Sequence, residues 1–101
     1  MGKHSYSPRL EMRSFVARLT ERVLRGQSPI VIGLDPRLDA LPSNVAPGAA
    51  PAQRIVAFYR EVLPRLARHA PCVKPNIAFF ECYGSDGYRA YEEVAALAQQ
   101  H

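Results

Sequence analysis

Two oppositely charged residues of this 101-residue chain stand at the ends of short apolar runs. Asp35 follows residues 30–34 (Ile-Val-Ile-Gly-Leu), and Lys74 follows residues 71–73 (Pro-Cys-Val). A charge placed against apolar sequence costs stability unless it is used or paired. If the runs are neighbouring parallel strands, about 4.8 Å apart, both side chains face one cavity at the carboxyl ends, where α/β enzymes place their active sites. The pair is interpreted either as part of an active site or as an ion pair that closes the end of the sheet.

Polar and aromatic residues after the second run allow two interpretations each. Asn76 either binds a ligand or completes the turn after Pro75, and the turn is favoured. Phe79 and Phe80 either wall a pocket or belong to the core, and the core is favoured. Glu81 is interpreted as a surface charge rather than a catalytic acid.

The cysteines and histidines show no metal-binding pattern. Cys72 and Cys82 form no Cys-x-x-Cys pair. The histidines, which have no partner motif, are His4, His69 and His101. We therefore expect no metal site, and we expect reduced thiols in the cytoplasm.

Hydrophobic periodicity predicts the elements that hold these residues. They are an amphipathic helix over residues 10–25, a strand over 30–35, a loop over 36–51, a helix over 52–68, a strand over 70–74, a loop over 76–83 and a helix over 88–100. The apolar stripe of the first helix comprises Met12, Phe15, Val16, Leu19 and Val23. Pro64 is expected to kink or shorten the second helix, and Ser85 or Asp86 to cap the last one. The long loop is expected to be functional or mobile.

The alternation of apolar strands and helices predicts an α/β fold. Continuous apolar runs indicate strands buried on both faces, and the helices between them indicate right-handed βαβ units in a parallel sheet. Two parallel strands do not make a stable sheet, so a third strand is expected to follow. We therefore expect residues 10–101 to be an N-terminal fragment of one domain, after a flexible N-terminus over residues 1–9.

Composition and charge exclude several classes of protein. The chain is 48% hydrophobic and 22% charged, which is typical of a soluble globular protein rather than a disordered one. The net charge of +4 lies within residues 1–25, where arginines follow a helix face opposite the apolar stripe. This face is interpreted as solvated surface rather than a nucleic-acid site, with an organellar transit peptide as a weaker alternative. No apolar run approaches the roughly 20 residues of a membrane span.

Two longer motifs resemble one enzyme family. Residues 31–36 (Val-Ile-Gly-Leu-Asp-Pro) and residues 73–81 (Val-Lys-Pro-Asn-Ile-Ala-Phe-Phe-Glu), followed by Tyr83, Gly84 and Gly87, are similar to the opening of orotidine 5′-phosphate decarboxylases. The resemblance covers residues 12–100. It is strongest to the bacterial branch in which the Lys-Pro-Asn-x-Ala-Phe-Phe-Glu string is usual.

The resemblance implies the N-terminal part of a cofactor-free TIM (β/α)8 barrel, truncated before strand 3. The implied lyase converts orotidine 5′-monophosphate to uridine 5′-monophosphate and carbon dioxide in pyrimidine biosynthesis. Asp35 matches the residue that hydrogen-bonds the ribose of the substrate, and Lys74 the catalytic-array lysine that contacts the ribose and pairs with an aspartate. Asn76 is expected to bind substrate, without an assigned chemical step. The full-length family is expected to be a homodimer.

Part of the family's machinery does not occur in residues 1–101. The family's Asp-x-Lys-x-x-Asp motif, which supplies an aspartate beside the substrate carboxylate and the lysine that protonates the ring carbon, has no match here. Decarboxylation leaves negative charge on a ring carbon, and its acceleration requires preorganised charges aimed at that atom. We therefore expect this polypeptide to be inactive alone.

Two other interpretations of the chain stay open. The first is a TIM-barrel aldolase in which Lys74 forms a Schiff base, although a neighbouring aspartate favours the charged amine over the neutral one that this chemistry needs. The second is a non-catalytic α/β fragment or interaction module that pairs its open strand edges with a partner chain.

Overall fold

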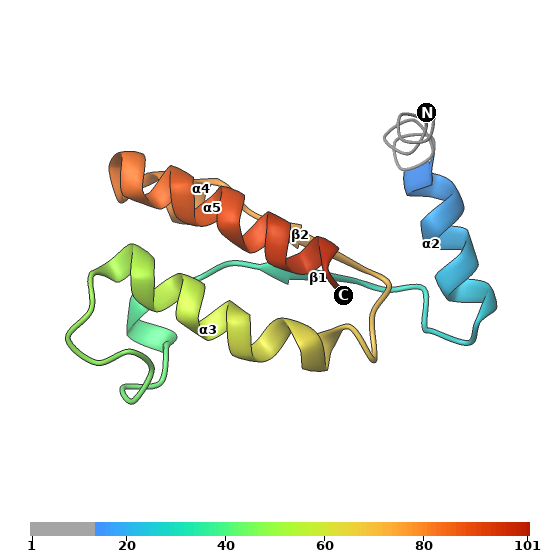
Figure 1. The fold of residues 1–101 in the computed structure, drawn as a ribbon, viewed down its shortest axis with the longest axis horizontal. Helices are drawn as coiled ribbons and strands as arrows, with labels where there is room; N and C mark the ends of the chain where they lie inside the picture. Colours follow the sequence, from blue (N-terminus) through green and yellow to red (C-terminus); the bar gives the residue numbers. More distant parts are fainter. Residues whose placement is uncertain (1–13) are drawn as a thin grey trace, which may run out of the picture.

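A computed structural model describes residues 14–101 of the chain (Figure 1). Its elements, in chain order, are helix α2 (Ser14–Leu24), strand β1 (Val31–Leu34), the 3-10 helix η1 (Leu38–Ala40), helix α3 (Pro51–Leu66), strand β2 (Cys72–Pro75), the short helix α4 (Ala78–Glu81) and helix α5 (Gly84–Gln99). The expected flexible segment 1–9 and the expected helix start at residue 10 lie outside the described residues. None of the described helices has the length and apolar character needed to cross a membrane.

Strands β1 and β2 pair in parallel, which confirms the predicted α/β class. Val31 is opposite Cys72, and Leu34 is opposite Pro75. A parallel pair requires a crossover connection, and α3 supplies it. Pro75 is the last residue of β2, as expected of a residue that cannot donate a backbone hydrogen bond.

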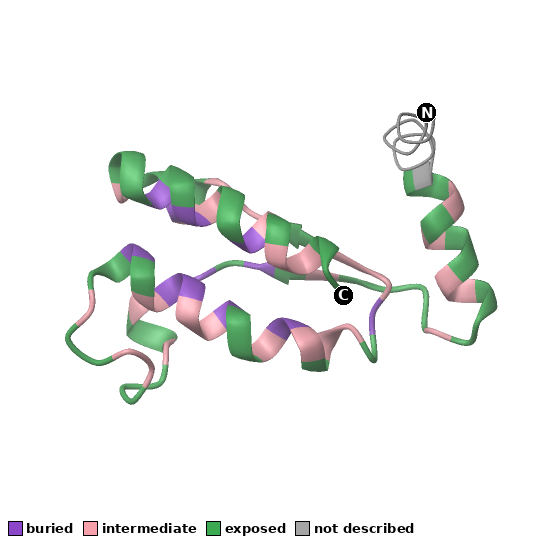
Figure 2. Cartoon of the chain, in the orientation of Figure 1, coloured by how far each residue is buried: buried purple, intermediate pink, exposed green. Residues whose placement is uncertain are grey.

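The core lies between one face of this sheet and the helices α3 and α5, which pack against each other (Figures 1 and 2). Leu34 of β1 is 2% exposed, and Ile55 of α3 and Val94 of α5 are fully buried. Burial of each such side chain contributes about 1.5–3 kcal/mol. The apolar stripe that periodicity predicts for α3 includes Ile55 and Tyr59, which are buried, but not Val56 and Leu63, which are buried as well. The stripe predicted for α5 includes Val94 but not the buried Ala90.

Helix α4 stands where a loop was predicted. Phe80 on this helix is fully buried, and its ring meets Tyr91 of α5 edge to face, with centroids 5.4 Å apart. The loop prediction was wrong because a helix of four residues carries no periodic signal and depends on tertiary packing for its stability.

Helix α5 begins at Gly84, earlier than predicted. Its N-cap is Tyr83, whose side chain makes no capping hydrogen bond, so Ser85 and Asp86 lie inside the first turn instead of capping it. Gly84 has φ +71, a conformation that glycine adopts without steric cost. The cap prediction was wrong because this glycine starts the helix before the capping residues are reached.

Helix α3 runs through Pro64 and ends at Leu66, two residues before the predicted end. Proline at this position removes one backbone donor, but only the last turn of the helix follows it. The end of the helix lies two residues earlier than predicted, and the effect of Pro64 on it stays a prediction. At the other end Pro51 opens the helix, where its missing N–H has no intrahelical partner to lose.

Helix α2 differs from α3 and α5 because none of its residues 15–24 is buried. Phe15 is 55% exposed and Val16 69%, whereas Leu19 is half-buried. Arg22, expected on a solvated face, is half-buried and donates a hydrogen bond to the carbonyl of His101. The predicted separation into an apolar face and a solvated arginine face therefore holds only in part.

Candidate active site

Asp35 and Lys74 lie on the same face of the sheet, near the carboxyl ends of the strands. Lys74 is opposite Gly33 in the register, and Asp35 is two residues beyond Gly33, so the pleat directs all three positions to one face. A Cβ built on Gly33 would lie 3.8 Å from Oδ1 of Asp35, which agrees with this direction. The structure brings the two charges to one face, and their chemical role stays a prediction.

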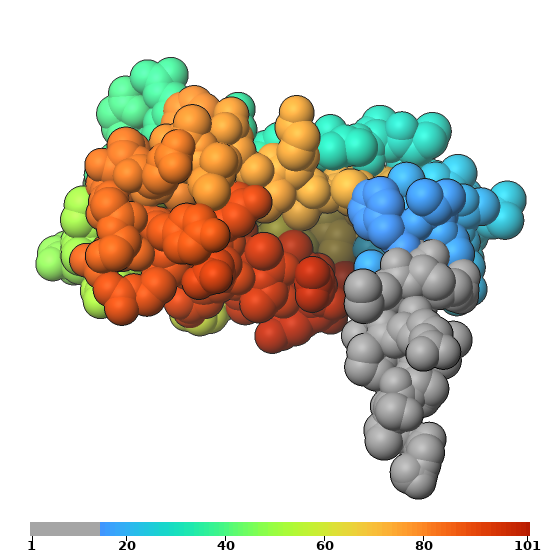
Figure 3. Space-filling model, turned by 90° about the horizontal axis from the view of Figure 1, so that it is seen from above, coloured from blue at the N-terminus to red at the C-terminus, as the bar shows by residue number. Residues whose placement is uncertain are grey.

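This face of the sheet is open to solvent. Val31, Gly33, Asp35 and Lys74 are exposed, whereas Leu34 points to the helices. In Figure 3 the teal β1 and amber β2 segments run along one side of the molecule, and the red segment of α5 lies on the other. The burial predicted for both faces of the strands is not observed, because no element among residues 14–101 covers this side.

The alternative interpretation of the pair as a simple ion pair finds no support in the geometry. The ion pairs found within residues 14–101 involve other residues and do not join Asp35 to Lys74. Ligand binding by the carboxylate and the ammonium group stays a prediction.

Asn76 lies beside Asp35 and stabilises the turn between β2 and α4. Its backbone N–H donates to the carbonyl of Leu34 (3.1 Å), which extends the ladder by one residue. Its Oδ1 accepts a hydrogen bond from the N–H of Ala78 (3.2 Å), an Asx turn that starts α4. The turn interpretation is confirmed. Ligand binding through the remaining Nδ2 group stays a prediction.

Tyr59 is a neighbour of Asp35 that the sequence identified only as part of the apolar stripe of α3. Its side chain is buried, and its ring meets Phe58 edge to face, with centroids 5.2 Å apart. Burial raises the pKa of Tyr59 to about 12, and the negative charge of Asp35 adds to the shift. The phenol therefore stays neutral at physiological pH. No sequence signal separates this residue from Ile55, which shares its stripe.

The side chain of Arg54 contacts two points of the long loop between β1 and α3. Arg54 of α3 donates from Nε to the carbonyl of Val45 (3.0 Å) and from Nη2 to the carbonyl of Pro42 (3.1 Å). The segment that begins directly after Asp35 is therefore anchored to α3. Its functional role stays a prediction.

The remaining candidates take the positions that the sequence favoured, except Phe79, which is half-buried and lies outside the core. Phe80 belongs to the core, and Glu81 is exposed. Cys72 is half-buried and Cys82 is exposed, both as free thiols. Within residues 14–101 no group of three or more His, Cys, Asp or Glu side chains is placed to hold a metal ion.

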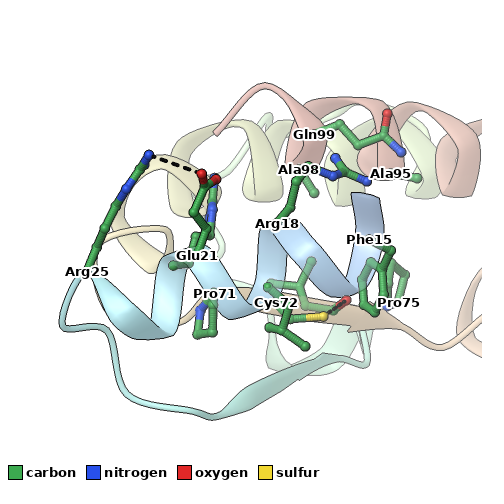
Figure 4. Close-up of a pocket in the computed structure, with 13 residues that line it drawn as sticks. Phe15, Arg18, Glu21, Arg25, Pro71, Cys72, Pro75, Ala95, Ala98 and Gln99 are labelled. Atoms are coloured by element: carbon green, nitrogen blue, oxygen red, sulfur yellow. Dashed lines mark hydrogen bonds and ion pairs between the residues drawn. The ribbon is translucent and has the colours of Figure 1, made fainter. Parts of the chain in front are cut away.

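A cavity of about 470 Å³ lies away from these charges, between α2, β2 and α5 (Figure 4). In Figure 4 Arg18 reaches from α2 toward Ala98 and Gln99 of α5. Asp35 and Lys74 do not line this cavity. The charged pair and the cavity are therefore separate features of the sheet.

Comparison with known proteins finds relatives that share one name. No family model and no solved structure matches the chain. It is 38% identical over 81 residues to the orotidine 5′-phosphate decarboxylase of Leptospira interrogans, 39% over 85 residues to that of Halobacterium salinarum and 38% over 90 residues to that of Deinococcus radiodurans. The matches cover 80%, 84% and 85% of this chain, but only 28%, 30% and 29% of the respective relatives. The resemblance seen in the sequence is confirmed, and the chain spans less than a third of the length of these curated relatives.

Proposed function

Because the homologues of this chain are orotidine 5′-phosphate decarboxylases, we propose that it forms the N-terminal part of such an enzyme. The proposed whole is a TIM (β/α)8 barrel of about 250 residues, to which residues 10–101 contribute a helix and two strand-helix units. The parallel pairing of β1 and β2 through α3 supports this assignment. The proposed reaction converts orotidine 5′-monophosphate to uridine 5′-monophosphate and carbon dioxide in pyrimidine biosynthesis.

The observation that carries the proposal is the shared direction of Asp35 and Lys74 at the carboxyl ends of two parallel strands. TIM-barrel enzymes gather their active-site groups at this end. We assign Asp35 to accept hydrogen bonds from the ribose hydroxyls of the substrate. Lys74 is assigned to donate to the ribose and to pair with an aspartate from the rest of the barrel. Asn76, beside Asp35, offers its Nδ2 group as a further donor.

Asp35 and Lys74 alone are not sufficient to catalyse the decarboxylation. The carbanion that decarboxylation leaves must be stabilised and then protonated at a ring carbon, which requires several preorganised charges in a site that excludes water. The face that carries Asp35 and Lys74 is open to solvent. We therefore expect residues 1–101 to bind the nucleotide weakly and not to turn it over.

An ultraviolet assay of orotidine 5′-monophosphate loss tests the expected inactivity. The purified 101-residue chain should show no loss above the rate of a buffer blank. Measurable turnover that disappears in Lys74→Ala would contradict the proposal that the chain is an incomplete enzyme.

Binding of the same nucleotide tests the assignment of the site. In an NMR titration, Asp35→Asn and Lys74→Ala should each weaken binding by about fivefold or more, as expected when an interaction of roughly 1 kcal/mol with a charged group is lost. Arg89→Ala is the matched control, because Arg89 is an exposed cation on α5 that pairs with Asp86. If Lys74→Ala and Arg89→Ala weaken nucleotide binding equally, Lys74 is not part of the binding site.

The finer features of the whole enzyme are part of the same proposal. We place it in the cytoplasm as a homodimer that uses no cofactor, with residues 1–9 as a flexible lead-in. The Schiff-base alternative predicts that borohydride traps a carbonyl substrate on Lys74, and no observation favours it. The interaction-module alternative is favoured by the open strand edges.

A further inference from the structure

The guanidinium of Arg54 binds both ends of one turn in the loop between β1 and α3. Its Nη2 donates to the carbonyl of Pro42 (3.1 Å), and its Nε donates to the carbonyl of Val45 (3.0 Å). The N–H of Val45 donates to the same carbonyl of Pro42 (3.1 Å), which closes residues 42–45 into a turn. We call these residues the Arg54 turn. Because Arg54 lies in the first turn of α3, it ties the Arg54 turn directly to that helix.

The residue after the Arg54 turn has a backbone angle that requires support from its surroundings. Ala46 has φ +42, in the left-handed region. This region is sterically costly for a residue other than glycine. Such an angle persists where the surrounding contacts determine it. The two hydrogen bonds from Arg54 are contacts of this kind, and a charged donor makes them stronger than bonds between neutral groups.

The other end of the loop begins at Asp35. We call residues 36–41, which join Asp35 to the Arg54 turn, the η1 wall. Within it Leu38 and Leu41 pack against the core, and both line a cavity of about 410 Å³ together with Arg54. In Figure 3 the green segment around η1 lies at the same edge of the molecule as the teal β1 and the amber β2. The η1 wall therefore borders the open face that carries Asp35.

We propose that Arg54 is a positioning residue for the proposed nucleotide site. By fixing the Arg54 turn, it keeps the η1 wall in place beside Asp35, and it acts on the ribose only through this wall. The inference rests on the proposed function, because the ligand is the nucleotide assigned to Asp35 and Lys74. A nucleotide that needs the wall binds with an affinity proportional to the fraction of chains in which the wall is in place.

Hydrogen exchange followed by NMR measures the restraint without a ligand. The N–H of Val45 reports on the Arg54 turn, and the N–H of Leu41, which donates to the carbonyl of Leu38 (3.2 Å), reports on the η1 wall. Arg54→Ala should accelerate exchange at both N–H groups by about tenfold or more, since a hydrogen bond to a charged group is lost. Unchanged exchange at Leu41 would overturn the proposal, because the wall would then not depend on Arg54.

Arg60→Ala is the matched control for this measurement. Arg60 lies on the same helix as Arg54, is exposed and pairs with Glu93 of α5 (3.0 Å). Its replacement should change exchange at Val45 and Leu41 by less than about twofold, as expected for an exposed ion pair. Equal acceleration in the two variants would show a general loosening of α3 and would overturn the specific role of Arg54.

Titration with orotidine 5′-monophosphate measures the consequence for the site. Arg54→Ala should raise the Kd by about threefold or more, because fewer chains keep the η1 wall in place. Its effect and that of Asp35→Asn should be less than additive, since both act on the ribose at one place. Fully additive effects would overturn the proposal, because Arg54 would then act independently of Asp35.

Chemical rescue tests whether the paired hydrogen bonds are what matters. Ethylguanidinium supplies the missing planar donor group, so it should restore both slow exchange at Leu41 and the Kd in Arg54→Ala. Arg54→Lys should restore neither, because a single ammonium group does not reproduce the fork of a guanidinium. Full restoration by lysine would show that charge alone is sufficient and would overturn the proposal.

The outcomes separate this inference from the proposed function. If Asp35→Asn weakens nucleotide binding and Arg54→Ala leaves the Kd unchanged, the proposed function stands and the positioning role is overturned. If Asp35→Asn leaves the Kd unchanged, the proposed function fails, and the role of Arg54 in that site fails with it. Weaker binding in both variants, together with faster exchange at Leu41 in Arg54→Ala, supports both.

Discussion

The two faces of the β1–β2 sheet share a backbone but differ in how strongly packing restricts their side chains. Leu34 is 2% exposed against α3 and α5, whereas Val31, three residues earlier on the same strand, is 57% exposed on the other face. On the covered face, side-chain volume and close packing decide which residue fits. The open face carries Asp35, Lys74 and a glycine, and packing imposes little on it. Substitutions of similar size should therefore destabilise the chain far more on the covered face than on the open face.

The largest difference is expected between two glycines. A Cβ on Gly87 of α5 would lie 1.7 Å from the backbone oxygen of Phe80, whereas a Cβ on Gly33 meets only Asp35 at 3.8 Å. Gly87→Ala should lower the free energy of unfolding by more than about 4 kcal/mol and abolish cooperative unfolding in urea, because the backbone at Phe80 has to move. Alanine in a helix interior otherwise stabilises by about 1 kcal/mol, so the sign of the effect is diagnostic. Gly33→Ala should change stability by less than about 1 kcal/mol, and a larger loss would mean that the open face is packed.

Truncation of one apolar side chain on each face gives the next effect. Leu34→Ala should lower the free energy of unfolding by about 2–5 kcal/mol, since it removes a buried side chain and leaves a cavity. Val31→Ala should cost less than about 1 kcal/mol because Val31 is already in water. Urea denaturation followed by circular dichroism measures both, and similar costs would show that the two faces are equally buried.

Alkaline pH should destabilise the chain through Tyr59, a core residue that lies near Asp35 of the open face. The pKa of this phenol is about 12 in the folded chain against 10.0 for the free side chain. Its contribution to stability is fully present below pH 10 and is lost as pH rises from 10 to 12, because the unfolded chain ionises first. Between pH 10 and 12 the free energy of unfolding should fall by roughly 1–2 kcal/mol more in the wild-type chain than in Tyr59→Phe. If the free energy of unfolding falls equally with pH in the two proteins between pH 10 and 12, the raised pKa of Tyr59 is contradicted.

The smallest effect is expected where the two faces meet, at Asn76. Asn76→Ala removes the acceptor of the Ala78 N–H and should cost about 1 kcal/mol, as for other capping side chains. Asn44→Ala, on an exposed asparagine of the β1–α3 loop, is the control. A midpoint of urea unfolding that is the same for both variants would show that the Asx turn contributes nothing to α4.

Sequence reasoning succeeded where a signal is local. The apolar runs ending at Asp35 and Lys74 identified both strands. The predicted stripes of α3 and α5 identified part of their buried faces, because burial on one side imposes a period. The position of the two charges on one face followed from the parallel register. Their roles came from the resemblance rather than from this reasoning.

The failures have a common physical cause, which is that the deciding contact comes from a residue distant in sequence or from a single backbone angle. Helix α4 depends on the burial of Phe80 against Tyr91. The start of α5 depends on the positive φ of Gly84. The proximity of Tyr59 to Asp35 depends on how α3 folds back on β1, and the exposure of α2 on what packs against it. None of these has a signature within a window of a few residues.

The parallel register also sets a delay during synthesis. Val31–Leu34 of β1 has its partner only when Cys72–Pro75 of β2 has been made, since α3 and its loops lie between them. At about 5–20 residues per second, the roughly 40 intervening residues take about 2–8 s to translate. For those seconds β1 is an apolar segment without a strand beside it. In the growing polypeptide it is therefore an apolar segment that is accessible to a chaperone at the ribosome.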